Sequence, residues 1–188
     1  MRLTSTLERL LSRSSTGAND LLLVSTLELL QGALLIHPPS RSLFAREIYM
    51  NLLLDLLDPT SCPAIQSSTV LVLVTSLLET PKNIRCFERV DGLLAVTSLF
   101  KSGCTGREVK MRIVEFFYFY LMPETPIGAG AVRNGQQRTP SKRLGSGGPP
   151  LADTKTTEEK QALLGRYLNN VEDLVEDLRD SAWGAVIS

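Results

Sequence analysis

The apolar residues of the first 122 positions recur every three or four residues, the spacing of one face of an α-helix. Leu3, Leu7, Leu10 and Leu11 form the first such stripe. Proline, glycine and helix-capping residues divide the rest into segments, because proline disfavours helical geometry in the residue before it. The pattern predicts further helices at residues 21–36, 40–57, 63–79, 81–90, 93–103 and 105–122.

The stretch VLVLV at residues 70–74 would suggest a β-strand if it stood alone. Its apolar pattern continues from Ala64 to Leu78, which is longer than a typical strand, and no alternating neighbour is present to pair with it. We therefore predict a helix here, and an all-α fold of consecutive antiparallel helices joined by short loops.

The composition changes after Leu121-Met122. Residues 123–156 are rich in Gly, Pro, Ser and basic side chains, with five basic and two acidic groups. Such a segment has little apolar surface to bury and is predicted to be a flexible linker. Within it, RTPSKR places Thr139 before a proline and three positions before Lys142, the pattern of a proline-directed kinase site; a plain basic linker is the alternative.

Residues 157–188 are acidic and return to a helical pattern, with Thr156 or Thr157 as the predicted cap. The apolar positions step by 3, 4, 3 and 4, which makes two heptads of a coiled-coil seam: Leu164, Tyr167, Val171, Leu174 and Leu178. Two heptads are too short for a stable isolated coiled coil. The seam is therefore expected to pack back on the helical body or on a partner; a homodimeric coiled coil is the alternative.

Five of the eleven aromatic residues are consecutive, in FFYFY at residues 116–120. Successive residues of a helix are about 100° apart, so this run points in every direction. A helix that is apolar all round is normally buried, which places Phe116, Phe119 and Tyr120 in the core.

One side of this helix is the best candidate for a partner-binding surface. Tyr118 shares a face with Met111, Glu115 and Met122, which is more polar and adaptable than the Phe side, and Tyr and Met are common at interfaces. Together with the C-terminal seam, the candidate partner-binding residues are Phe117, Tyr118, Tyr120, Met122, Glu124, Tyr167, Val171, Leu174 and Leu178.

Charge and composition exclude several classes of protein. The chain has 20 basic and 20 acidic side chains, whereas a protein that binds a phosphate backbone needs a basic excess. An odd number of cysteines without paired spacing indicates reduced thiols and a cytoplasmic protein. No secretory signal is visible, and the most apolar stretch, residues 21–36, is short for a membrane span and carries Glu28 and Gln31.

The sequence shows no arrangement of side chains that is typical of catalysis or of cofactor binding. His37 is the only histidine, and its place beside Pro38-Pro39 is typical of a helix C-terminus. No Cys/His cluster has metal-ligand spacing, and GSGG at residues 145–148 does not lie between a strand and a helix, as a phosphate loop would. We therefore expect neither enzymatic activity nor a cofactor; an enzyme of unrecognised type would need a buried, perturbed acid–base pair.

Two stretches resemble known proteins. NIRCFERVDGLLAVTSLF is similar to the inner part of an armadillo or HEAT repeat, although no strict repeat period is visible and a plain helical bundle is the alternative. With LLLVSTLELLQGALLIHPPSRSLFARE and FFYFYLMPET, nearly the whole chain resembles the fungal cell division control protein 14 family, a component of the septation initiation network. The phosphatase that shares this name has a Cys-x5-Arg loop, which is absent here.

The resemblance implies a non-catalytic partner of a germinal-centre-type Ser/Thr protein kinase. It further implies action at the spindle pole body, where the complex triggers septum formation and cytokinesis. Charge and composition divide the chain into three parts: a helical, armadillo-like domain at residues 1–122, the linker at 123–156, and the C-terminal helix at 157–188.

Overall fold

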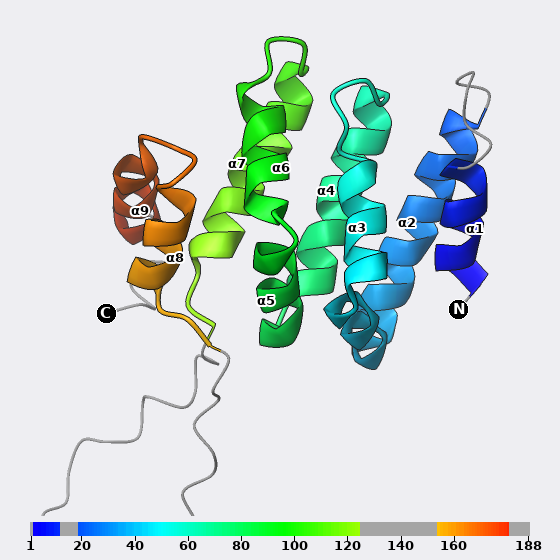
Figure 1. Cartoon of the computed structure of the whole chain (residues 1–188), viewed down its shortest axis with the longest axis horizontal. Helices are drawn as coiled ribbons and strands as arrows, with labels where there is room; N and C mark the ends of the chain where they lie inside the picture. Colours follow the sequence, from blue (N-terminus) through cyan, green and yellow to red (C-terminus); the bar gives the residue numbers. More distant parts are fainter. Residues whose placement is uncertain (1, 12–18, 125–153, 181–188) are drawn as a thin grey trace, which may run out of the picture.

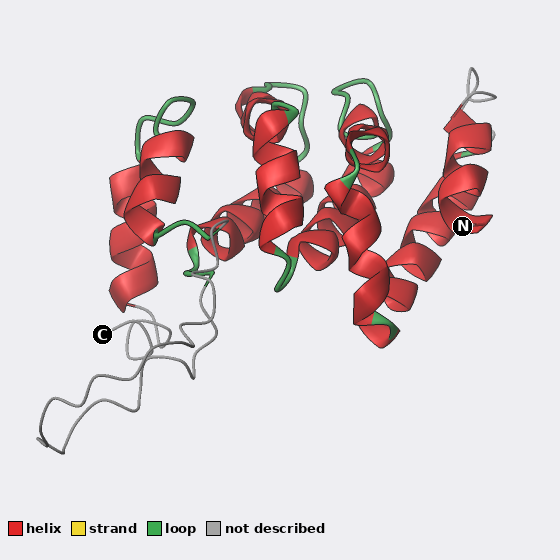
Figure 2. Ribbon diagram, turned by 60° about the horizontal axis from the view of Figure 1, so that its bottom comes forward, coloured by secondary structure: helices red, strands yellow, loops and turns green. Residues whose placement is uncertain are grey.

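The computed structural model describes residues 2–11, 19–124 and 154–180. Every regular element in these ranges is a helix, as Figure 2 shows, so the all-α prediction is confirmed for the described residues. Most of the predicted linker, including Thr139, lies outside them. The elements are α1 (Arg2–Leu11), α2 (Asp20–Ile36), the 3-10 helix η1 (Pro38–Ala45), α3 (Glu47–Asp55), α4 (Pro63–Leu77), α5 (Pro81–Arg89), α6 (Gly92–Lys101), α7 (Arg107–Leu121), α8 (Thr157–Leu164) and α9 (Val171–Asp180).

The helices are stacked side by side along the long axis of the molecule (Figure 1). The long helices α2, α4 and α7 form one row, because α4 packs against both of the others. The short helices η1, α3 and α5 pack against one another beside this row. Two short helices followed by one long helix occur twice, as η1–α3–α4 and as α5–α6–α7. The two triplets start 43 positions apart, at Pro38 and Pro81.

The helix prediction for VLVLV is confirmed, since residues 70–74 lie inside α4. Val70, Val72 and Leu73 are all buried, although they point in different directions around the helix. This is the expected pattern for α4, which has α2, α7 and η1 as neighbours. An apolar run therefore reflects a central helix here, and not a strand.

The single helix predicted for residues 40–57 is wrong. The segment forms η1 and α3, with Arg46 extended between them at φ −93° and ψ 128°. In a 3-10 helix residues i and i+3 lie above one another, and this directs Arg41 and Phe44 inward together.

Arg41, whose side chain is buried, ties three helix ends together through its side chain and its backbone carbonyl. Its Nε donates to the carbonyl of Leu34, near the end of α2, at 3.2 Å, and its Nη1 donates to the carbonyl of Leu78, at the end of α4, at 3.1 Å. Asn83 of α5 in turn donates to the backbone carbonyl of Arg41 at 2.7 Å. The last carbonyls of a helix lack partners within the helix, so a buried cation is well suited to this position.

The end of α4 allows a small stabilisation to be predicted. Glu79 follows the helix with φ 53°, a left-handed conformation that glycine adopts at lower cost. Its side chain is mostly exposed and reaches Arg41 only at 3.6 Å. Glu79→Gly should therefore raise the free energy of unfolding by roughly 0.5–1 kcal/mol. Urea unfolding measures this, and a lower midpoint would show that the ion pair outweighs the backbone strain.

The single C-terminal helix predicted from residue 156 to about 181 is also wrong. Helix α8 ends at Leu164, with Gly165 as its cap, and α9 begins at Val171 after Asn169-Asn170. Glycine weakens a helix and asparagine favours positions before a helix, so local preferences explain the break. The continuous two-heptad seam, on which a coiled-coil homodimer would depend, is therefore not formed.

The prediction that the C-terminal segment packs back on the body is confirmed. Leu164, Leu168 and Val171 are buried in the same hydrophobic core as α7. Both α8 and α9 contact α7, which also contacts α4 and α6. The aromatic helix is thus covered on several sides, as its composition predicted.

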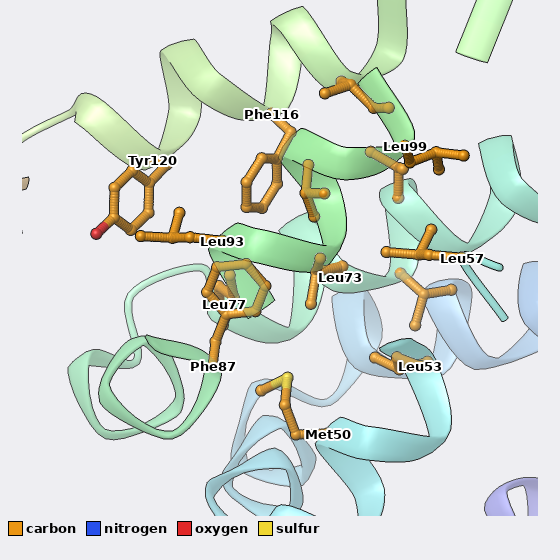
Figure 3. Packing of buried hydrophobic residues seen from close by; sticks show 14 of the residues in the cluster. Met50, Leu53, Leu57, Leu73, Leu77, Phe87, Leu93, Leu99, Phe116 and Tyr120 are labelled. Carbon is orange, nitrogen blue, oxygen red and sulfur yellow. The ribbon is translucent and has the colours of Figure 1, made fainter. Parts of the chain in front are cut away.

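The aromatic side chains of α7 hold the centre of this core. Phe116 meets Phe87 of α5 edge to face at 5.5 Å, and Phe117 meets Phe100 of α6 at 5.6 Å. Figure 3 shows Phe116 and Tyr120 projecting from α7 toward Leu93. Phe116 and Tyr120 are fully buried, as predicted, whereas Phe119 is partly buried at the edge of the core.

Candidate partner-binding site

The end of α7 is where the sequence-predicted site residues meet. Pro123 stops the helix, and Met122 before it is extended, with ψ 144°. The last carbonyls of α7 are then bound by the returning chain: the hydroxyl of Thr157 donates to Leu121 at 3.1 Å, and the ammonium of Lys160 donates to Met122 at 2.8 Å. Helix α8 therefore caps α7.

The start of α8 is fixed by a capping box. The hydroxyl of Thr156 accepts from the backbone N–H of Glu159, and the Glu159 carboxylate accepts from the backbone N–H of Thr156. The predicted cap at Thr156 is confirmed. This pairing satisfies two orphan donors of the helix and sets the direction in which α8 leaves α7.

A buried carboxylate, Glu124, links the two sides of this junction. Its side chain is 2% exposed and accepts from Arg85 of α5 at 2.6 Å and from Lys160 of α8, itself 1% exposed, at 3.0 Å. The other oxygen accepts the backbone N–H of Lys155 at 3.1 Å. The Glu124 carboxylate, just after α7, thus binds the chain again where it enters α8.

A second carboxylate, Glu88 of α5, extends the cluster. It accepts from the Tyr120 hydroxyl at 2.7 Å, pairs with Arg85 at 3.0 Å and binds the ammonium of Lys155. Three cations and two carboxylates give the cluster a net charge of +1. We call these residues the junction cluster: Arg85, Glu88, Tyr120, Glu124, Lys155 and Lys160.

Burial perturbs two members of the junction cluster. It lowers the pKa of Lys160, and the Glu124 carboxylate partly offsets this shift. Burial also raises the pKa of Tyr120 far above its usual value, and the adjacent Glu88 carboxylate raises it further. Each of these groups is already engaged by other side chains or carbonyls of the fold. The cluster is therefore suited to hold α5, α7 and α8 together.

The raised pKa of Tyr120 makes its contribution to stability dependent on pH. The phenol stays protonated in the folded chain and ionises in the unfolded chain above about pH 10. Its contribution is therefore present below pH 10 and lost as the pH rises further. We expect Tyr120→Phe to cost about 1.5–3 kcal/mol at pH 8, since the hydrogen bond is to a charged acceptor.

Urea unfolding of both forms between pH 8 and 11 tests this expectation. The charged groups around the ring are the same in both proteins, namely Arg85, Glu88, Glu124, Lys155 and Lys160, so the difference between the two proteins reports on the phenol. The difference should shrink above pH 10. A difference that stays constant across this range would contradict the assignment.

The structure places the candidate partner-binding residues at two depths. Phe117, Tyr120 and Val171 are buried in the core. Those that are partly buried are Tyr118, Met122, Tyr167 and Leu174, whereas the side chain of Glu124 is buried in the junction cluster. The side chain of Leu178 lies outside the described residues.

Of the junction cluster, the sequence analysis named Glu124 and Tyr120, as candidate partner-binding residues, and missed Arg85, Glu88, Lys155 and Lys160. One signal was available for Lys160: it lies four residues before the buried Leu164, and so on the apolar side of α8. A cation on the buried face of a helix requires a partner, which marks it as a member of an internal ion pair. The other three carry no local signal.

Two further observations bear on function. Within residues 2–11, 19–124 and 154–180, no three His, Cys, Asp or Glu side chains are grouped as metal ligands. In the same ranges no single helix is long and apolar enough to cross a membrane. Helices α2 and η1 pass that test only as a pair, by length and composition, and they are bent by 116°.

Comparison with known proteins identifies the family. The sequence profile of the family described as "Cell division control protein 14, SIN component" matches residues 1–183. The chain belongs to this family. The match extends from α1 through α9, so the junction cluster lies wholly within the region that the family shares.

A curated relative within the family is Cell division control protein 14 of Schizosaccharomyces pombe. It is 34% identical over 152 residues, which are 81% of this chain and 55% of the relative. The chain thus spans about half the length of the relative that it matches. No solved structure matches the chain.

Proposed function

We propose that this protein is a non-catalytic binding and regulatory partner of a Ser/Thr protein kinase of the septation initiation network. It would control septum formation and cytokinesis from the cytoplasm and the spindle pole body. The observation that carries the proposal is the family match over residues 1–183, because the family is described as a component of this network. The kinase as partner and the spindle pole body as location are inferences beyond that match.

The environment of the ionisable side chains supports a binding role. The perturbed groups of the junction cluster, Tyr120 and Lys160, are buried and bonded to the fold, which does not favour an acid–base pair that meets a substrate. We therefore infer that the protein acts as a scaffold. A generic phosphoesterase or kinase activity that follows the protein peak through gel filtration would overturn this part.

The stack of helices supports an armadillo-like architecture. The two helix triplets start 43 positions apart, within the 40–47 residues typical of such repeats. Repeats of this type pack helix pairs into an extended body whose surface binds partners. On this proposal α8 and α9 continue the stack beyond α7.

The most direct test of the proposed function is affinity purification of the full chain from dividing cells, with identification of the copurifying chains. We expect a Ser/Thr kinase of the network to copurify in amounts comparable to the bait. Leu174→Asp, at a partly buried position of α9 that packs against the core, should reduce its recovery or lower the melting temperature. Wild-type melting together with undiminished recovery would remove the junction from the binding surface.

A further inference from the structure

Helix α2 is apolar on both sides, but the described residues cover only one of them. Its inner side, with Leu23, Leu27, Leu30 and Leu34, is buried, and the helix packs against α1 and α4. A second set of apolar side chains is exposed, and we call it the α2 outer face: Leu21, Leu22, Leu29, Leu35 and Ile36.

The exposure of this face is large and concentrated. Leu21 is 82% exposed, Leu29 64% and Ile36 87%. Among the described residues eight large hydrophobic side chains are exposed, and five of them belong to this one helix. Single exposed leucines need no explanation, but a contiguous apolar face indicates an interaction surface.

The α2 outer face has room for a second helix to approach closely. At 100° per residue, Ser25 and Gly32 fall within the same arc as the exposed leucines. A Cβ atom added to Gly32 would have no atom within 4 Å. Small residues between large ones form the grooves that receive the side chains of a packed helix.

The charge on α2 selects the kind of partner. Asp20 and Glu28 are its only charged residues, and Glu28 is exposed among the leucines of the outer face. We propose that the α2 outer face docks an amphipathic helix of a partner protein that carries Lys or Arg beside its apolar stripe. The inference rests on the proposed function only in that it takes a partner protein to exist.

Two other occupants fit this charge pattern less well. Glu28 is the midpoint of α2, so a two-fold pair of α2 helices crossing at their centres would set one Glu28 against the other. Membrane-surface helices carry Lys and Arg toward anionic lipid, and α2 has neither.

The test uses two synthetic amphipathic helices with the full-length protein. Both peptides have about five turns and the same leucine stripe; one carries Lys on its flanks and the other Glu. We expect the Lys peptide to bind about tenfold or more tightly than the Glu peptide, measured by fluorescence anisotropy. Glu28→Lys should reverse this preference.

The apolar contribution is tested with Leu29→Ser combined with Ile36→Ser. Both side chains are exposed, so melting should be unchanged while the Lys peptide binds about tenfold or more weakly. Leu94→Ser, at a half-exposed leucine on α6, is the matched control and should leave binding unchanged. Equal binding of the two peptides, no binding at all, or an equal loss in the control would overturn the proposal.

Other results would assign the face differently and also overturn the proposal. A homodimer by light scattering that Leu29→Ser disrupts would assign the face to a second copy. Binding to phosphatidylcholine–phosphatidylserine vesicles that the same variants abolish would assign it to lipid. If hydrogen exchange at α2 is slow in the free chain and Leu29→Ser accelerates it, the α2 outer face is covered by a segment of the same chain. Failure with the peptides while the kinase still copurifies would reject this surface but leave the proposed function intact.

Discussion

Glu124→Gln is expected to lower the free energy of unfolding by about 3–5 kcal/mol. The substitution keeps the shape of the side chain but removes the charge that neutralises Lys160, which is 1% exposed. Breaking a buried pair by removing one partner leaves an uncompensated buried charge, and this is the costly case. For a chain of this size the loss corresponds to a fall of roughly 10 °C in melting temperature.

Two comparisons make this expectation specific. Glu115→Gln removes the carboxylate of a solvent-exposed pair with Arg112 on the same helix, and should cost less than about 1 kcal/mol. Lys160→Met added to Glu124→Gln removes the orphaned cation, so the double variant should be more stable than Glu124→Gln alone. If the two substitutions instead lower the free energy of unfolding additively, Glu124 and Lys160 do not act as a pair.

Gly92→Ala is expected to destabilise the fold by about 3 kcal/mol or more. A Cβ at this position would lie 2.2 Å from two ring carbons of Phe87 and 2.7 Å from its backbone carbonyl oxygen. The ring is fully buried and packs edge to face on Phe116, so it has no space to move away. The carbonyl belongs to α5 and cannot shift without disturbing that helix.

The matched control for Gly92→Ala is Gly32→Ala in α2. A Cβ at Gly32 meets nothing within 4 Å, and alanine is favoured over glycine inside a helix by about 1 kcal/mol. The same exchange of residues should therefore raise the melting temperature at one site and lower it sharply at the other. Similar small changes at both positions would contradict the close packing at the turn between α5 and α6.

Apolar spacing was sufficient to predict the long helices. Residues such as Val72 and Phe117 are buried because other helices pack around their own helices. A long run of such apolar residues therefore indicates a buried helix, because it exceeds the length of a typical strand. The break inside residues 40–57 could not be predicted in this way. It accompanies the tertiary hydrogen bonds of Arg41 to the ends of α2 and α4, which leave no local pattern.

The break between α8 and α9 had a local signal in Gly165 and Asn169-Asn170, which the regular leucine spacing outweighed. The junction cluster shows a different limit of prediction from sequence. Arg85 and Glu124 are 39 positions apart, and Lys155 and Glu124 are 31 apart. Charged residues in a sequence usually indicate a solvated surface, so their burial follows only from the return of the chain to α7.

The central proposal is that this protein binds a kinase of the septation initiation network. Light scattering coupled to size exclusion measures this most directly, with the full-length chain, the purified kinase and their mixture. The proposal predicts a monomer for the chain alone and, in the mixture, a new species whose mass is the sum of the two proteins. A homodimer that persists in the presence of the kinase, with the kinase eluting separately, would contradict it.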